Sequence, residues 1–210
     1  MQTQETIITQ SDVKKVYGHL APIYDLVFGA VFAQGRSALR KELASLQPTR
    51  ILEVGVGTGL MLDKYPINSK VNGIDIAKEM LEIAKHRAAA LPHMNIQLDV
   101  MDAEKLDFED NSFDCVVMPY VLSVTPNPDA LVAEVRRVCE KDGTIMIVNH
   151  FSGNGPWYLL EKLVKNIAEI IGFRSEFDYE SHILKHDWHV KRVTKVNLFG
   201  LSKLIVIRNK

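Results

Sequence analysis

Residues 50–60 read RILEVGVGTGL, a short apolar and partly β-branched run that ends abruptly in a glycine-rich segment. This order is typical of a buried strand that runs into a tight loop. The glycines occupy alternate positions, at Gly55, Gly57 and Gly59. Because glycine has no Cβ and tolerates positive φ, such a loop leaves room for a bound molecule against the backbone. The stretch predicts a ligand-binding junction between a strand and a loop, although a plain β-turn is also compatible with it.

The spacing of these glycines does not fit two common nucleotide-binding loops. A dinucleotide fingerprint, G-x-G-x-x-G, that begins at Gly55 needs a third glycine at position 60, where the chain has Leu60. A Walker loop needs a phosphate-binding lysine, and the chain continues with Leu60 and Met61 instead. An acid, Glu53, lies inside the strand just before the first glycine. The glycine spacing alone therefore does not identify the ligand of the loop, and the neighbouring apolar runs are needed to identify it.

Two further apolar runs also end beside an acid. Residues 71–76 read VNGIDI and carry Asp75 near their end, and residues 96–100 are followed by Asp102. In nucleoside-binding α/β sheets, an acid at the tip of the second strand accepts hydrogen bonds from the ribose hydroxyls. The alternative for either aspartate is a helix N-cap or a solvated loop acid. Three acid-bearing strand ends in succession favour a nucleoside site.

Together, the strings EVGVGTG, GIDI and DVMDAEKL resemble the class I S-adenosylmethionine-dependent methyltransferases, and the resemblance extends from about residue 17 to the end. It implies S-adenosylmethionine as the cofactor and S-adenosylhomocysteine as the product. It also implies cofactor roles for residues at the strand tips. These are Glu53, Gly55, Gly57 and Gly59 at the methionine portion, Asp75 at the ribose, Ile76 and Met80 against the adenine, Asp102 at its exocyclic amine with the Met101 and Ala103 backbone nearby, and Pro119 at the end of the fourth strand.

Strand-like and helix-like runs alternate along the chain, which predicts an α/β fold with a doubly wound, mostly parallel sheet. Helices are expected at 78–91, from Asn127-Pro128 to about Cys139, and at 157–171, while the acidic stretch 102–112 is too short for more than a turn. The closing runs 190–198 and 201–208 predict an antiparallel hairpin at one edge. The resemblance implies the seven-stranded Rossmann-like methyltransferase sheet. No linker or repeat divides residues 1–210, so we expect a single domain.

The N-terminal segment has two interpretations. Residues 1–10 are polar and are expected to be disordered, and residues 11–46 follow as helices that Pro22 interrupts. Residues 26–33 are apolar on nearly all sides, so protein, lipid or substrate must cover them. They form either a lid over the cofactor pocket or a surface that contacts a membrane or a lipidic substrate.

Composition excludes several classes of protein. A hydrophobic content of 47%, a charged content of 24% and a formal net charge of −1 suit a soluble enzyme and exclude a strongly basic nucleic-acid binder. Cys115 and Cys139 have neither metal-ligand nor disulfide-framework spacing, so we expect no metal and a reducing compartment. No run reaches the roughly 18 apolar residues of a membrane span, and the first residues lack the pattern of a signal peptide.

The methyl acceptor should lie outside the carboxyl ends of the fourth and fifth strands, beneath the N-terminal segment. An amine acceptor must lose a proton, which a histidine or a tyrosine hydroxyl could take. The alternatives are a histidine satisfied by backbone and tyrosines that only pack in the core. The predicted catalytic residues are Tyr17, Tyr24, Tyr120 and His150, with Ser123 and Asn149 as further acceptor contacts.

Shorter strings narrow the resemblance. Residues 17–29 (YGHLAPIYDLVFG), 120–128 (YVLSVTPNP) and 147–153 (IVNHFSG) look like the bacterial phosphatidylethanolamine N-methyltransferases, whereas DAEKLDFEDNSFD is shared with quinone C-methyltransferases. The resemblance implies stepwise methylation of a phospholipid headgroup toward phosphatidylcholine, by a cytoplasmic protein bound peripherally to the inner face of the cytoplasmic membrane. Methylation of a soluble small molecule or quinone precursor, and a cofactor-binding module without catalysis, stay open.

Charge near the C-terminus fits contact with an anionic membrane. Basic residues outnumber acids from Lys185 onward, where Asp187 is the only acid. Near an anionic bilayer each basic residue contributes about 1 kcal/mol of attraction. The alternative is a solvated edge hairpin with no partner.

Overall fold

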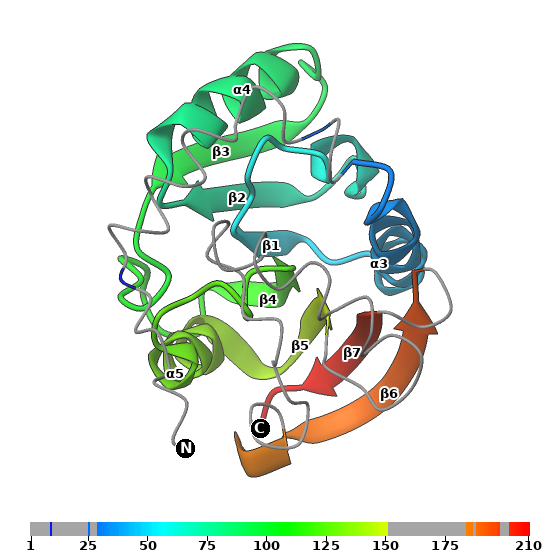
Figure 1. Ribbon diagram of the computed structural model, residues 1–210, viewed down its shortest axis with the longest axis vertical. Helices are drawn as coiled ribbons and strands as arrows, with labels where there is room; N and C mark the ends of the chain where they lie inside the picture. Colours follow the sequence, from blue (N-terminus) through cyan, green and yellow to red (C-terminus); the bar gives the residue numbers. More distant parts are fainter. Residues whose placement is uncertain (1–8, 10–24, 26–28, 151–183, 187, 198–201) are drawn as a thin grey trace, which may run out of the picture.

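A computed structural model of the chain describes residues 9, 25, 29–150, 184–186, 188–197 and 202–210. Its strands form one seven-stranded sheet in the order β3-β2-β1-β4-β5-β7-β6 (Figure 1). The strands are β1 Arg50–Val54, β2 Lys70–Asp75, β3 Asn95–Val100, β4 Phe113–Pro119, β5 Cys139–His150, β6 His189–Val196 and β7 Ser202–Arg208. Strands β1 to β5 are parallel, and β7 runs antiparallel to both β5 and β6. The predicted parallel sheet with an antiparallel edge hairpin is confirmed.

Helices cover both faces of this sheet. They are α3 Ala33–Leu46, α4 Lys78–Ala89 and α5 Pro128–Val138, with short 3-10 turns at Leu62–Lys64 and Leu184–His186. Successive strand residues point to opposite faces, so Ile145 and Ile147 pack with α5 while Met146 and Val148 pack with α3. This alternation makes the sheet apolar on both sides, as a doubly wound fold requires.

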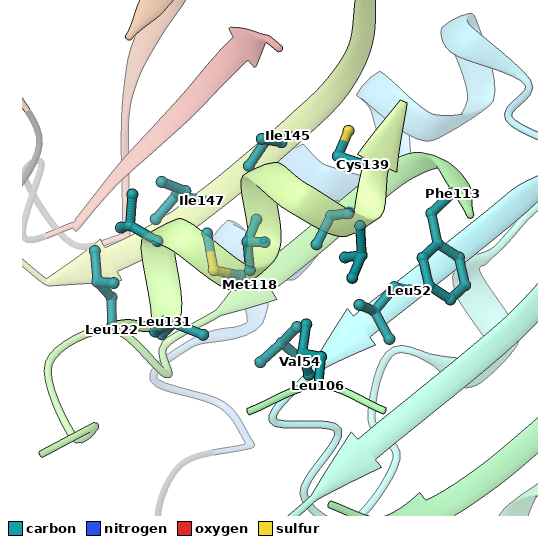
Figure 2. Close-up of a cluster of buried hydrophobic side chains, with 14 of the residues drawn as sticks. Leu52, Val54, Leu106, Phe113, Met118, Leu122, Leu131, Cys139, Ile145 and Ile147 are labelled. Carbon is teal, nitrogen blue, oxygen red and sulfur yellow. The ribbon is translucent and has the colours of Figure 1, made fainter. Parts of the chain in front are cut away.

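The larger core cluster lies under α5, whose apolar face packs onto the strands of the sheet (Figure 2). Helix α5 begins as the sequence predicts. The Asn127 side-chain oxygen accepts a hydrogen bond from the Ala130 amide at 3.1 Å, and Pro128 occupies the first turn. Leu131 is completely buried against this cluster. Removing such a side chain costs about 2–5 kcal/mol of stability in general.

One local prediction is wrong. The sequence places Cys139 on a helical face, whereas the structure ends α5 at Val138 and begins β5 at Cys139 in extended conformation. The strand then carries an irregularity, since Phe113 pairs with Cys139 while Cys115 pairs with Thr144. Asn209 stabilises it by donating hydrogen bonds from its side-chain amide to three backbone carbonyls around the junction. A contact with a residue far along the chain leaves no periodic signal.

Further predictions concern the acidic stretch, the helix expected at 157–171 and the N-terminal segment. The acidic stretch 102–112 contains turns and no helix, as predicted. The predicted helix at 157–171, the N-terminal residues 1–8, and most of the segment 11–28 lie outside the described residues. In the part of the chain that the structure describes, no helix is both long and apolar enough to span a bilayer.

Candidate cofactor site

The carboxyl ends of β1, β2 and β4 and the turn after β3 surround an open cavity, which together with the solvent space at its mouth occupies about 750 Å³. Nine of the eleven residues predicted to hold a cofactor line it. These are Gly55, Gly57, Asp75, Ile76, Met80, Met101, Asp102, Ala103 and Pro119. Parallel strands bring them together because all their carboxyl ends meet at one edge of the sheet.

The space around the backbone differs among the three glycines of the loop. Gly55, Gly57 and Gly59 all have positive φ, at 72°, 56° and 83°. A Cβ added to Gly57 would meet no atom within 4 Å, so the loop is open there. A Cβ on Gly59 would lie 2.7 Å from Leu62 and 3.2 Å from Ala84, and Gly59 lines neither cavity described here. Gly59 therefore allows the loop to pack closely on α4, and its role as a cofactor contact stays a prediction.

Asp75 fixes the loop to the end of β2. Its carboxylate accepts hydrogen bonds from the backbone amides of Gly57 at 2.8 Å and Ala77 at 2.9 Å. Burial raises the pKa of Asp75, although these amides oppose the shift. The N-cap position of α4 belongs to Ala77, so the alternative of Asp75 as a helix N-cap is not what the structure shows.

Asp102 lies in a turn that closes the far side of the cavity. One of its carboxylate oxygens accepts a hydrogen bond from the Glu104 amide at 2.9 Å, and no helix follows. Glu104 in turn accepts from the Thr125 hydroxyl at 3.0 Å and the Asn127 amide at 2.7 Å, which joins this turn to the loop after β4. The sequence analysis missed a group of lining residues in these two loops. They are Glu104, Val121, Val124, Thr125 and Pro126.

A second, smaller cavity adjoins the first and occupies about 340 Å³ together with the solvent space at its mouth. Four residues line both cavities and so mark their junction. These are Gly55, Gly57, Pro119 and Tyr120. Glu53 lies in the wall of the smaller cavity, only 1% exposed, and its Oε2 atom has no hydrogen-bond partner among the described residues. Burial raises the pKa of Glu53 to about 8, against the opposing effect of the neighbouring Tyr65 hydroxyl.

Arg36 is a further lining residue of the smaller cavity that the sequence did not reveal. It belongs to α3, is 9% exposed, and donates a hydrogen bond to the Gly29 carbonyl. The spacing of apolar residues assigns its position on the helix to a solvated polar face. Periodicity alone therefore does not predict that Arg36 lines a cavity. An arginine and a carboxyl group thus share one small cavity, and their hydrogen-bonding groups suit the carboxylate and ammonium of an amino acid.

Asp25 contacts the glycine loop. Its carboxylate accepts a hydrogen bond from the Thr58 hydroxyl at 2.6 Å and pairs with the Arg87 guanidinium of α4. Arg87 also donates to the Thr58 carbonyl at 2.6 Å. Although partial burial opposes the shift, the hydrogen bonds from Arg87 and Thr58 hold the pKa of Asp25 below its ordinary value. Asp25 is therefore fixed at the loop that borders both cavities.

Among the predicted acceptor residues that the structure describes, Tyr120 is the one that lines these two cavities. Its backbone has a positive φ of 63°, and its ring stacks on Phe32 with centroids 4.1 Å apart. Its hydroxyl accepts a hydrogen bond from the Asn197 side chain at 2.8 Å. Burial raises the pKa of Tyr120 to about 12, so the hydroxyl stays protonated and is a poor proton acceptor at neutral pH.

Three other predicted acceptor residues are described by the structure and lie outside these cavities. Ser123, Asn149 and His150 are buried, and they are joined by hydrogen bonds from the Ser123 hydroxyl to the Asn149 side chain and from that side chain to the His150 carbonyl. None of them lines these two cavities. Tyr17 and Tyr24 lie outside the described residues. Within the described ranges, no cluster of His, Cys, Asp or Glu side chains could hold a metal ion.

Comparisons with known proteins identify the family. Residues 52–147 match the model of a methyltransferase domain. The phosphatidylethanolamine N-methyltransferase of Cereibacter sphaeroides is 40% identical over 162 residues, which cover 75% of this chain and 78% of that protein. The 2-phytyl-1,4-naphtoquinone methyltransferase of Trichormus variabilis is 29% identical over 192 residues, 81% of each chain.

A solved structure supports the fold. The geranyl diphosphate C-methyltransferase of Streptomyces coelicolor, in complex with S-adenosyl-L-homocysteine, superimposes with a TM-score of 0.66 at 12% identity, over 83% of this chain and 76% of that chain. The orphaned Glu53 oxygen, the open cradle at Gly57 and the Asp75 carboxylate also fit such a nucleoside. The chain belongs to the S-adenosylmethionine-dependent methyltransferases.

Proposed function

We propose that this enzyme transfers methyl groups from S-adenosylmethionine to the amine of phosphatidylethanolamine and its methylated intermediates, toward phosphatidylcholine. The observation that carries the proposal is the 40% identity to a phosphatidylethanolamine N-methyltransferase over three quarters of the chain. The two joined cavities supply a site of the required kind, since one suits a nucleoside and the other suits an amino acid.

The cofactor would bind across both cavities. Asp75 would accept hydrogen bonds from the ribose, Ile76 and Met80 would pack on the adenine, and Asp102 would accept from its exocyclic amine beside Met101 and Ala103. Glu53 and Arg36 would bind the ammonium and carboxylate of the methionine portion across the glycine loop. Pro119 would border the junction between the two portions.

When bound, S-adenosylmethionine supplies an electrophilic methyl group on a positively charged sulfur. The chain has to align the acceptor amine with that methyl group and exclude water, and good alignment alone can lower a barrier by about 7–11 kcal/mol. The neutral Tyr120 ring at the junction can attract a cationic ammonium group by about 0.5–2 kcal/mol. Because its hydroxyl is bound to Asn197 and stays protonated, Tyr120 would act through its ring. His150 stays the candidate proton acceptor, with Tyr17 and Tyr24.

Peripheral contact with an anionic membrane is part of the proposal. Strand β6 forms one edge of the described sheet, where Lys191 and Lys195 lie in solvent. Lys195 lies directly opposite Lys203 on β7, so two basic residues are neighbours on one face of this hairpin. Arg192 on the same strand pairs with Glu42. We place the contact at the inner face of the cytoplasmic membrane.

The direct test is incubation of the protein with methyl-labelled S-adenosylmethionine and vesicles that contain phosphatidylethanolamine. We expect label in the lipid fraction, first as the monomethylated headgroup. Vesicles of phosphatidylglycerol alone provide the control for non-specific labelling. Absence of label in the lipid, with bound cofactor demonstrated in the same preparation, would reject the proposal.

A second candidate is methylation of a quinone precursor or another soluble small molecule. The 29% identity to a naphthoquinone methyltransferase over most of the chain favours it as the alternative. It predicts activity without vesicles and no sedimentation with them. A protein that binds S-adenosylhomocysteine tightly but methylates neither lipids nor quinone precursors would instead be a cofactor-binding module.

A further inference from the structure

A buried asparagine outside both cavities holds three elements of the site together. Asn197 follows β6, is 4% exposed, and has a left-handed backbone with φ of 59°. Its side-chain oxygen accepts a hydrogen bond from the Gly35 amide of α3 at 2.9 Å. Its side-chain nitrogen donates to the Tyr120 hydroxyl at 2.8 Å and to the Ser202 hydroxyl at 2.9 Å. Every polar atom of this side chain is therefore used.

The hydroxyl that Asn197 binds belongs to a tightly fitted ring. A Cβ on Gly35 would lie 2.0 Å from the Tyr120 hydroxyl oxygen, so α3 approaches the ring only because it carries glycine there. Phe32, immediately before α3, stacks on the ring with an interplanar angle of 22°. The ring itself lines both cavities at their junction. The orientation of Tyr120 thus depends on contacts made outside the cavities.

We infer that Asn197 is a positioning residue: it acts through the Tyr120 hydroxyl to fix the wall that the nucleoside and amino-acid cavities share. The inference rests on the proposed placement of the cofactor across both cavities. Loss of the Asn197 side chain would leave the Tyr120 hydroxyl without this donor, and the ring could then turn away from the junction. A displacement of about 1 Å at such a point is enough to weaken binding and alignment.

The test measures the Kd of S-adenosylhomocysteine by calorimetry for a set of variants. Asn197→Gly removes the side chain and keeps a residue that adopts positive φ readily. Asn197→Asp keeps an acceptor for Gly35 and can accept from the Tyr120 and Ser202 hydroxyls. Tyr120→Phe keeps the ring and removes the hydroxyl. Asn111→Gly is the matched control, because Asn111 is an exposed residue with a similar φ of 57°.

We expect the Kd to rise about fivefold or more in Asn197→Gly and in Tyr120→Phe, because both release the ring. The double variant should be no weaker than either single one, since the two residues act through one contact. Asn197→Asp should bind within about twofold of the wild type, and Asn111→Gly should be unchanged. An unchanged Kd in folded Asn197→Gly, or independent losses that multiply in the double variant, would overturn the inference.

Two further readouts separate this inference from its premises. If Asn197→Gly does not fold, Tyr120→Phe decides alone, and an unchanged Kd there contradicts the inference. In the lipid assay, kcat of Asn197→Gly should fall about tenfold while the lipid KM changes less, because alignment rather than acceptor binding is lost. A wild type that binds S-adenosylhomocysteine but labels no lipid would reject the proposed acceptor and leave the Kd comparison intact.

Discussion

At the scale of single residues, Glu53 is the most informative side chain. Burial raises its pKa from 4.5 to about 8, so the folded protein holds this proton more tightly than the unfolded chain does. The neutral carboxyl therefore contributes stability that is complete below pH 4.5 and is lost as the pH rises through 8. A glutamine at this position cannot ionise, and so it should not suffer this loss.

We therefore predict that Glu53→Gln becomes more stable relative to the wild type as the pH rises from 5 to 8.5. For a chain of this size, each kcal/mol shifts Tm by about 2–4 °C, so the gap in Tm between the two proteins should widen by at least that amount. Thermal unfolding followed by circular dichroism at several pH values measures it. A constant gap would mean that Glu53 is already charged in the folded protein.

Asp75 gives a second prediction at this scale. Asp75→Ala should raise the Kd of S-adenosylhomocysteine about tenfold or more, because it removes a charged acceptor of two hydrogen bonds. The same change also releases the Gly57 amide and loosens the loop. Asp99→Ala is a suitable control, since Asp99 bonds to Gln97 on its own strand. Equal affinity of wild type and Asp75→Ala would show that the ribose binds elsewhere.

Some residues of the site could be predicted from the local sequence, and others could not. Gly57 and Asp75 could be predicted because a strand end followed by glycine or an acid is a local pattern. Arg36 could not, because an arginine on a helix reads as solvated unless the fold that buries it is known. Asn197 depends on contacts with residues up to 162 positions away, which no window of sequence contains.

At the scale of elements, α3 shows how packing can reverse an intrinsic preference. Alanine normally stabilises a helix relative to glycine by about 1 kcal/mol. At Gly35, however, the added Cβ would lie 2.0 Å from the Tyr120 hydroxyl and 2.9 Å from Val148, and overpacking costs about 1–3 kcal/mol. The clash should outweigh the gain in helix propensity.

We predict that Gly35→Ala lowers the free energy of unfolding by about 1 kcal/mol or more, as measured by urea denaturation. Ser37→Ala on the exposed face of the same helix provides the control and should be neutral or slightly stabilising. If Gly35→Ala stabilised the protein as much as Ser37→Ala, the close approach of the Tyr120 hydroxyl to Gly35 would be wrong.

Most elements could be predicted because their signals are local, such as the Asn127 cap and the proline that follows it. The junction at Cys139 could not, because a residue near the C-terminus stabilises it. The expected hairpin is formed by β6 and β7. The sequence did not predict that β7 would pair antiparallel with β5, because that pairing depends on the whole fold. Local patterns thus predict elements better than the joints between them.

At the scale of the whole molecule, exposed lysines lie at both ends of the sheet. The edge strand β6 presents Lys191 and Lys195, while the opposite end of the sheet carries exposed Lys70 and Lys85 near β2 and α4. We predict that Lys191→Gln/Lys195→Gln weakens sedimentation with phosphatidylglycerol-containing vesicles about tenfold or more at low salt, since each lysine contributes about 1 kcal/mol.

The control is Lys70→Gln/Lys85→Gln, which removes the same charge from the other end of the molecule. Binding of the wild type should also fall steeply as salt rises, because counterions screen charges within about 10 Å at 0.1 M. Equal losses in the two double variants would show that net charge, rather than the β6 edge, governs attraction to the membrane.

The account as a whole depends on a nucleoside that lies across the carboxyl ends of the parallel strands. A crystal structure of the complex with S-adenosylhomocysteine tests this most directly. We predict the adenosine in the larger cavity with Asp75 at its ribose, the amino-acid portion beside Glu53 and Arg36, and the sulfur at the junction that Tyr120 borders. Density for the ligand in any other place, with both cavities empty, would contradict the account.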